Sequence, residues 1–505
     1  MNQPRQTGFF GQPAGLRTLF FAEMWERFSY YGMRAILVLF MTKPIVEGGF
    51  GWPASKAGPV YGLYTASVYL MCLPGGWIAD RMIGPRKSVF WGGVIIMFGH
   101  IMLAIPSVNT FFVGLALVVV GVGLLKPNIS TMVGQLYAPE DERRDAGFSI
   151  FYMGINLGAM IAPLVVGYFA QSPSWRAVLA GWGLRPESSW HWGFGATAVG
   201  MFLGLVWYVV DRKALGDAGL APAVSSPADA AGVRRTFWRG IGIAGLLVAL
   251  IAILQGTGTI ALSAEKISNA FGVFLVILVV VFFAVLLMRS DWTPEERKRL
   301  YVILVLFIGA SVFWSVFEQA GSTLTLFADR STRNEVFGHA FPSSWWQSVN
   351  SAWIIILAPV FAWLWVWLGR RNPSSPAKFA VGLLLVSLSF FIMVPAAQLA
   401  NNGNRVGWWW LCSSYFLATA GELSLSPVGL SAMTRLAPAR VGSLLMGVWF
   451  MATSVGNFIG GRVAGVYEKF SLPQLFGVVA LYALVFAGLI AVLVKPIKRM
   501  LERPS

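Results

Sequence analysis

The sequence predicts an all-α integral membrane protein that crosses a lipid bilayer fourteen times. Of its 505 residues, 56% are hydrophobic and only 12% are charged, whereas about 25% charged residues is usual for soluble domains. The 55 glycines and 22 tryptophans are typical of closely packed membrane helices with aromatic anchors at the interfaces. A soluble fold could not bury this much apolar surface, so the composition excludes that class.

Fourteen apolar runs are long enough to cross the hydrocarbon core, because a spanning helix needs roughly 20 residues. An even number of spans places both termini on the same side of the membrane. In chain order the predicted spans are 19–42, 57–79, 88–107, 110–136, 147–170, 190–211, 238–262, 268–288, 300–328, 346–368, 378–399, 407–434, 441–466 and 471–494.

The basic residues predict the orientation. Of the 38 Lys and Arg residues, 25 lie in or beside the loops on the side of the termini, 9 lie in the opposite loops and 4 lie within spans. Because Lys and Arg concentrate in cytoplasmic loops, we expect both termini in the cytoplasm. The same bias accounts for the net charge of +16 without a basic patch, so we expect no nucleic-acid partner.

A polar stretch divides the chain. Residues 212–237 contain Ala-Gly-Leu-Ala-Pro-Ala-Val-Ser-Ser-Pro-Ala, which is typical of a flexible linker. It separates six spans from an inserted pair, which a basic stretch at Arg297-Lys298-Arg299 separates from six more. We therefore expect an N-terminal six-helix bundle at 1–211, a linker with two inserted helices at 212–299 and a C-terminal six-helix bundle at 300–505.

Charged residues within the spans are the main functional signal. Each costs roughly 2.5–3.5 kcal/mol at the bilayer centre on insertion scales, so such residues are rare and usually paired. A purely structural role would not explain so large a combined cost, so we expect these side chains to serve a function. They are Glu23, Glu26, Arg27, Arg34, Lys126, Glu318 and Glu422.

The first span carries a polar stripe. At 100° per residue its polar side chains fall within about 140° of one another, so they face protein or a cavity and not lipid. A buried carboxylate beside an Arg has two protonation states of comparable energy, which a proton carrier needs. A structural salt-bridge cluster is the alternative. The stripe consists of Glu23, Glu26, Arg27, Tyr30, Tyr31 and Arg34.

Seven segments together resemble one known family over nearly the whole chain. The first reads Glu-x-x-Glu-Arg-Phe-x-Tyr-Tyr-Gly, and the second is a cytoplasmic loop motif that by itself would indicate only a superfamily. The segments are Glu23–Gly32, Gly75–Arg81, Gly123–Asn128, Phe151–Gly158, Phe313–Gln319, Gln347–Asn350 and Gly421–Leu430.

These motifs resemble those of the proton-dependent oligopeptide transporter family, a branch of the major facilitator superfamily. The resemblance implies the major facilitator fold, with two six-helix bundles. The inserted helix pair is typical of bacterial members, which implies a bacterial inner membrane. It also implies proton-driven symport of di- and tripeptides into the cell by alternating access. We expect a monomer, because each carrier holds its own site between its two halves.

The resemblance also implies roles for the charged residues. Glu23, Glu26, Arg27 and Glu318 would couple proton movement to transport. Arg34 and Lys126 would attract the carboxylate of the peptide, and Glu422 would receive its amino terminus. Without substrate, Lys126 could pair with Glu422, and Arg34 with Glu318.

Further residues would contact the peptide. Those expected to donate or accept hydrogen bonds are Tyr30, Tyr31, Tyr69, Asn156, Asn350 and Ser426, while Trp314 and Trp449 would wall side-chain pockets. Packing is the alternative role for the aromatic residues. Ser426 precedes Pro427 and could instead satisfy backbone that the proline frees.

Other functions remain open at this point. Nitrate, an amino acid or a drug-like molecule is an alternative substrate, although Lys126 with Glu422 favours a zwitterion. A channel needs no Arg–Glu relay on one helix, and a receptor would need a ligand-binding soluble domain. The sequence contains no zinc pattern, phosphate loop or nucleophile motif, so we expect no enzyme, cofactor or metal.

Overall fold

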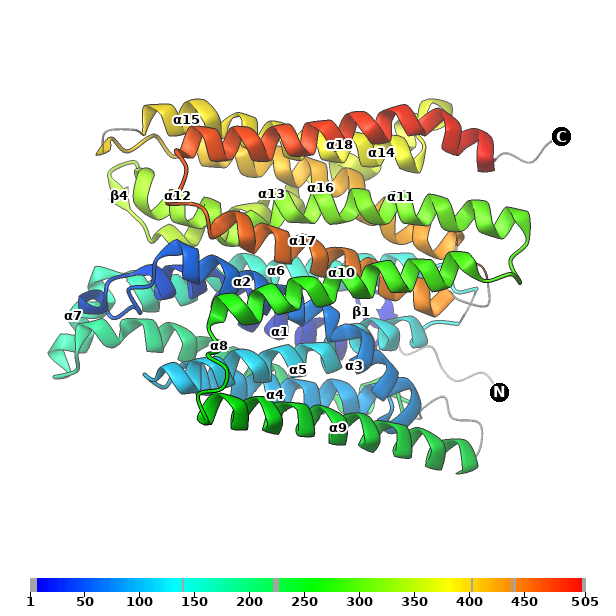
Figure 1. The fold of residues 1–505 in the computed structure, drawn as a ribbon, viewed down its shortest axis with the longest axis horizontal. Coiled ribbons are helices and arrows are strands. Elements are labelled where there is room, and N and C mark those ends of the chain that lie inside the picture. The colour runs from blue at the N-terminus through cyan, green and yellow to red at the C-terminus, as the bar shows by residue number, and fades with distance from the viewer. Residues whose placement is uncertain are drawn as a thin grey trace.

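The computed structural model describes residues 7–138, 140–220, 227–400, 403–436, 438 and 442–501. Helices running roughly parallel to one another make up nearly all of this part of the chain (Figure 1). The strands of this part of the chain form two small hairpins: β1 (Thr7–Phe9) with β2 (Gln12–Pro13), and β3 (Glu335–Val336) with β4 (His339–Ala340).

The first half and the inserted pair are built from ten helices in the described residues. The chain kinks at Met71, which divides one predicted span into α2 and α3. The helices are α1 (Gly15–Thr42), α2 (Ala54–Leu70), α3 (Cys72–Ile78), α4 (Pro85–Leu103), α5 (Val108–Gln135), α6 (Arg144–Gln171), α7 (Pro173–Gly181), α8 (Ser189–Val210), α9 (Pro227–Gly256) and α10 (Ala264–Met288).

The second half begins at a well-capped helix. The backbone N–H of Glu296 donates a hydrogen bond to the Thr293 hydroxyl, and the backbone N–H of Thr293 donates one to the Glu296 carboxylate. Pro294 follows at the first position of the helix. A short turn, η5 (Glu318–Gly321), interrupts the same predicted span, 300–328. The helices are α11 (Pro294–Phe317), α12 (Thr323–Ser331), α13 (Trp346–Trp367), α14 (Ser375–Phe391), α15 (Met393–Leu399), α16 (Trp409–Leu436), α17 (Gly442–Ala464) and α18 (Leu472–Leu501).

A helix lies within every predicted span, and the predicted all-α membrane fold class is confirmed. Nine helical segments of the described residues are long and apolar enough to cross a bilayer by length and composition. Helix α1 is not among them because it carries Glu23, Glu26, Arg27 and Arg34. The number fourteen therefore stays a prediction that the structure is compatible with.

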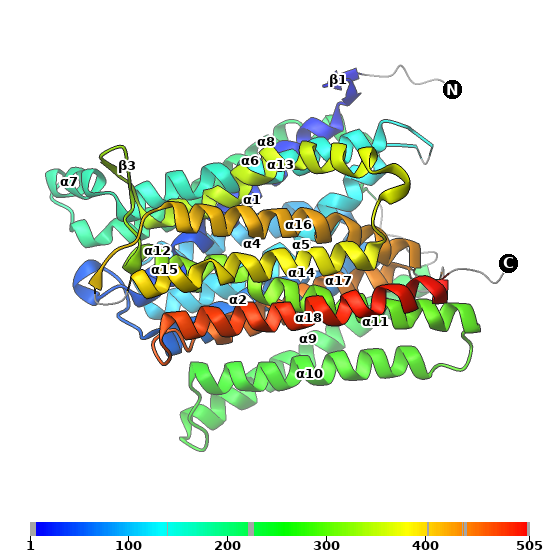
Figure 2. The same cartoon turned by 90° about the horizontal axis from the view of Figure 1, so that it is seen from above.

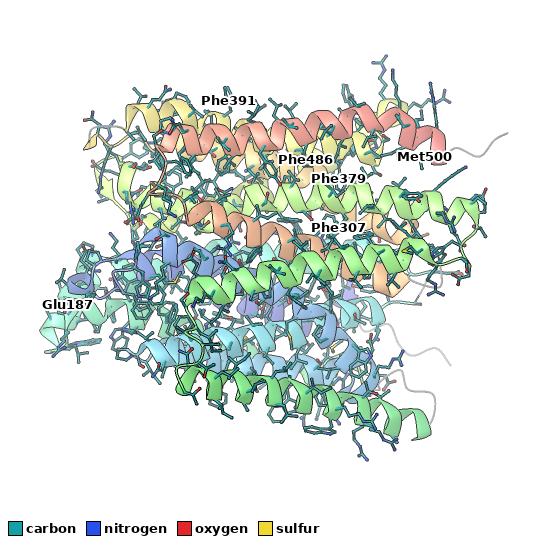
Figure 3. The ribbon with its side chains drawn as sticks, viewed as in Figure 1. Glu187, Phe307, Phe379, Phe391, Phe486 and Met500 are labelled. Carbon is teal, nitrogen blue, oxygen red and sulfur yellow. The ribbon has the colours of Figure 1, made fainter. Side chains whose placement is uncertain are left out.

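Two large hydrophobic cores lie side by side. One consists mainly of side chains from α1–α8, and the other of side chains from α10–α18. Figure 1 shows the first group of helices, in blue to cyan, below the second group, in green to red. Figure 2 shows α10 along the edge of the helix bundle. Phe307 and Phe379, labelled in Figure 3, belong to the second core, whereas Phe391 lies at its rim and is exposed.

The two groups of helices meet closely where α2 crosses α17. Gly58 and Gly62 of α2 lie against Gly461 of α17 and Gly465 just after it, and a Cβ on Gly62 would meet the Cα of Gly461 at 2.7 Å. This is the close backbone approach that small residues spaced four apart permit between membrane helices. Ser454 donates to the carbonyl of Ala66 at 2.8 Å and fixes the register.

Polar contacts join the same two groups at the end of the bundle where α1 ends. Lys43 and Asp329 form an ion pair of 2.9 Å. The backbone N–H of Ala54 donates to Glu468 at 3.2 Å, and Gln171 donates to Ser343 at 3.0 Å. The structure is therefore held together at this end by contacts between the groups.

Candidate functional site

The polar stripe of α1 faces the interior, as its periodicity predicts. Glu23, Glu26 and Arg27 are all at most 3% exposed. The Nε atom of Arg27 lies 3.1 Å from Glu23 Oε1 and also forms an ion pair with Glu26. Its guanidinium carbon lies 5.4 Å from the centre of the Tyr30 ring. Buried charges are tolerated in such a cluster because each has a partner of opposite sign.

A second buried ion pair links the two groups of helices. Arg34 Nη2 lies 2.9 Å from Glu318 Oε2, and both side chains are 6% exposed. Arg34 Nε also donates to the hydroxyl of Tyr61 at 2.9 Å. The neighbouring Gly321 leaves room for this contact, because a Cβ there would collide with both Tyr61 and Arg34.

A cavity of about 110 Å³ lies beside this ion pair. Residues of both groups line it, so the cavity is shared between the two halves of the molecule. Eight of the predicted site residues are among those lining it: Tyr31, Arg34, Tyr69, Asn156, Trp314, Glu318, Asn350 and Glu422.

Glu422 and Lys126 hold opposite charges near the cavity, but they are not paired with each other. Glu422 accepts a hydrogen bond from Asn350 at 3.3 Å. The ammonium of Lys126 lies 3.9 Å from the centre of the Tyr69 ring, a favourable cation–π geometry. Among the described residues no ion pair joins Lys126 to Glu422, so their expected direct pairing is not present in this structure.

The remaining predicted residues lie outside the cavity lining. Tyr30 is 1% exposed, with its ring 5.3 Å from that of Tyr31. Trp449 is buried, with its ring centre 6.5 Å from that of Trp314. Ser426 lies one helical turn beyond Glu422 on α16 and is not among the lining residues.

Four polar lining residues were missing from the predicted site: Tyr152, Gln347, Ser351 and Tyr415. Gln347 donates to the Tyr415 hydroxyl at 3.3 Å and also to the carbonyl of Ala320. Helical periodicity could have identified Gln347, because this residue precedes Asn350 by three positions and therefore lies on the same face of the helix.

The comparisons with known proteins agree on one family. The model of the POT family matches residues 86–479. The chain is 42% identical to the "Uncharacterized transporter YclF" of Bacillus subtilis, over 98% of this chain and 96% of that protein. It is 37% identical to the "Di-/tripeptide transporter" of Lactococcus lactis subsp. cremoris, over 99% of each.

Solved structures give the same result. The crystal structure of "peptide transporter POT in complex with sulfate" is similar with a TM-score of 0.89 and 42% sequence identity, covering 98% of this chain and 97% of that one. The helices, the buried ion pairs and the shared cavity are thus found on a chain that these comparisons place in one family of membrane transporters. This protein belongs to the POT family.

Proposed function

We propose that this protein carries di- and tripeptides into the cell together with protons by alternating access. One observation carries the proposal: the buried Arg34–Glu318 ion pair joins the two halves at a cavity with cationic and anionic groups. The name of the Lactococcus relative, a di-/tripeptide transporter, gives the substrate class.

The charges of the cavity suit a zwitterion. Arg34 and Lys126 belong to the first half, and Glu422 belongs to the second. In our proposal the two cations attract the peptide carboxylate and Glu422 receives its ammonium group, so that one substrate molecule draws the halves together. Charge-assisted hydrogen bonds of this kind are about twice as strong as neutral ones.

Neutral residues complete the proposed binding site. Peptide backbone groups would bond to Tyr31, Tyr69, Asn156 and Asn350, which line the cavity. Trp314 would wall a side-chain pocket, with Trp449 behind it. Tyr30 would hold Tyr31 in place through their edge-to-face ring contact. Ser426 would bond to the peptide only when α16 moves, because it does not line the cavity here.

Proton coupling is assigned to Glu23, Glu26, Arg27 and Glu318. Glu23 Oε2, Glu26 Oε1 and Arg27 Nη2 are buried without a hydrogen-bond partner among the described residues. Polar atoms left in this way are costly to bury, and a proton that binds Glu23 Oε2 or Glu26 Oε1 would neutralise that carboxylate. Protonation of Glu318 would release Arg34 from its ion pair and loosen the contact between the halves.

The setting of the carrier follows from the same features. We place it in the bacterial inner membrane with both termini in the cytoplasm, as the bias of basic residues favours. The end of the bundle with the Lys43–Asp329 pair then faces outward. We assign the N-terminal bundle to 1–211, the linker and inserted pair to 212–299, and the C-terminal bundle to 300–505. Because both halves of the cavity come from one chain, a monomer suffices.

Uptake of labelled dialanine into proteoliposomes tests the proposal. An inward proton gradient should drive accumulation, and Glu23→Gln or Glu26→Gln should remove the dependence on the gradient. Glu187→Gln, an exposed acid in the turn before α8, is the matched control and should behave like the wild type. Flux of equal size with and without the gradient would overturn proton coupling, and absence of dialanine uptake in the wild type would overturn the substrate.

A further inference from the structure

A second and much larger cavity lies outside the substrate site. It is a groove of about 790 Å³, within the range of roughly 300–1,000 Å³ typical of ligand pockets. Helices α6 and α8 form most of its lining, to which α1 also contributes. None of its lining residues is shared with the cavity at Arg34 and Glu318. The described part of the chain therefore has two separate cavities.

The groove lies against the apolar face of α1. Met24, Trp25 and Phe28 line it, whereas the neighbouring Glu23 and Arg27 form the buried ion pair of the opposite face. Anything that fills the groove would therefore press on the helix that carries the charged cluster.

The length of the groove matches one leaflet of a bilayer. On α8 the lining runs from His191 to Leu203, and on α6 from Gly158 to Phe169. Eleven to twelve residues of helix rise about 16–18 Å, close to half of the roughly 30 Å hydrocarbon core. Both helices are among those able to cross a membrane. The groove therefore has the length and the mostly apolar lining to accept an acyl chain.

The groove has an aromatic mouth where α8 begins. Trp175 and Trp192 line it, and their ring centres are 5.6 Å apart in an edge-to-face arrangement. Tryptophan is enriched at the level of lipid headgroups.

The segment around the mouth carries a net positive charge. Arg176 of α7 follows Trp175 and donates to Ser189 at 3.2 Å, and Arg185 lies in the connection between α7 and α8 together with one acid, Glu187. Basic sites at the membrane surface attract anionic headgroups. The charge at the mouth therefore complements a phosphate, and the apolar lining below it complements an acyl chain.

We propose that this groove is a binding site for one phospholipid of the leaflet in which α1 ends, with an acyl chain along α6 and α8 and its phosphate at Arg176 and Arg185. Under the orientation given above this is the outer leaflet. The bound chain braces the apolar face of α1. The site depends on the shape of the groove, and its occupancy can be measured without any transport assay.

Thermal unfolding of the purified protein tests the site. Dioleoyl phosphatidylglycerol added to the detergent-solubilised wild type should raise its melting temperature, because a ligand of the folded state stabilises it. Gly195→Leu should lose most of this shift. A Cβ at Gly195 would meet only Ala104, at 4.0 Å, so the larger side chain has room to occupy the groove, and Leu is a better helix former than Gly.

Gly488→Leu is the matched control. Gly488 is an exposed glycine of α18 with nothing within 4 Å of its Cβ position, and it lies in the other half of the molecule. This variant should keep the full lipid-induced shift. An equal shift in all three proteins would overturn the proposal, as would the absence of a shift in the wild type.

A structure with lipid bearing dibrominated acyl chains locates the occupant. Bromine signal should lie between α6 and α8 in the wild type and be absent from Gly195→Leu. Signal only elsewhere on the surface, detergent alone in the groove, or a second copy of the chain seated on it would each overturn the proposal.

Discussion

Arg34 of α1 and Glu318 of η5 form a buried ion pair of 2.9 Å between the two halves of the molecule. Removing one partner of such a pair costs about 3–5 kcal/mol, because the other charge is left buried and uncompensated. The pair therefore holds the halves together at the cavity for as long as both side chains stay ionised. A proton on Glu318, or a substrate carboxylate at Arg34, competes directly with it.

Glu318→Gln should abolish proton-driven accumulation of dialanine. The amide keeps the shape of the side chain but cannot neutralise Arg34, and it offers no site for a proton. We expect the initial rate in the presence of an inward gradient to fall by about tenfold or more, which corresponds to ~1.4 kcal/mol. Rates in proteoliposomes with and without the gradient measure this. Glu335→Gln, an exposed acid in β3, is the control, and an undiminished response of Glu318→Gln to the gradient would contradict the role.

Glu422→Gln should remove the preference for a free peptide amino terminus. A hydrogen bond to a charged group contributes about 1.5–3 kcal/mol, so the wild type should bind dialanine roughly tenfold to a hundredfold more tightly than N-acetylated dialanine. The variant should bind both equally. Competition against labelled dialanine measures the two affinities.

Lys126→Met provides the reciprocal control for that experiment. It should lose the preference for a free over an amidated carboxyl terminus and retain the preference for a free amino terminus. If both variants lost both preferences, the loss would reflect general damage to the cavity and not recognition of the two ends.

The sequence predicts those features of the site that depend on residues close together in the chain, but not the contacts between distant segments. The face shared by Glu23, Glu26 and Arg27 follows from helical periodicity alone, and the structure places all three in the interior. The partners of Lys126 and Glu422 do not follow, because their choice depends on how the two halves are placed. Tyr69 lies against Lys126, and Asn350 against Glu422.

Close approaches between distant segments were also beyond prediction. Nothing in the pattern around Gly321 indicates that Arg34 and Tyr61 occupy the space where its side chain would be. The groove on the apolar face of α1 likewise depends on how far α6 and α8 stand apart, which side-chain periodicity does not specify. The identity of a helical face is local information, whereas the shape of a cavity is a property of the packed bundle.

Gly461→Leu should open the contact between α2 and α17. A side chain at this position meets the backbone of Gly62 and the carbonyl of Gly58, so the helices must separate. We expect a cysteine introduced at Ser343, in a cysteine-free background lacking Cys72 and Cys412, to react faster with an impermeant maleimide added outside. Gly488→Leu should leave the rate unchanged. An unchanged rate in Gly461→Leu would show that this contact does not hold the outer end closed.

Lys43→Ala and Asp329→Ala should show energetic coupling at the same end of the molecule. Their ion pair of 2.9 Å is partly shielded, with side chains 25% and 15% exposed. Partly exposed pairs contribute about 0–1 kcal/mol, so we expect a modest coupling energy in a double-mutant cycle of the labelling rate at position 343. Additive effects of the two substitutions would show that the pair does not contribute to closure. High salt should weaken the coupling in the wild-type background, because screening acts on exposed charges.

Asp211→Asn should lower the thermal stability at neutral pH and make it less sensitive to acid. Burial acts to raise the pKa of Asp211, but hydrogen bonds from Arg17 and Thr18 together lower this pKa below its ordinary value. A depressed carboxyl pKa adds stability that is fully present above the unfolded value of about 3.9 and is lost as the pH falls through the folded value. The melting temperature of the wild type should therefore exceed that of the variant by a few degrees at pH 7, and the gap should narrow below pH 4. Asp217→Asn, an acid of the same connection with no resolved ion pair among the described residues, is the control. A gap that stays constant down to pH 3 would mean that the charge of Asp211 does not tie the start of α1 to the end of α8.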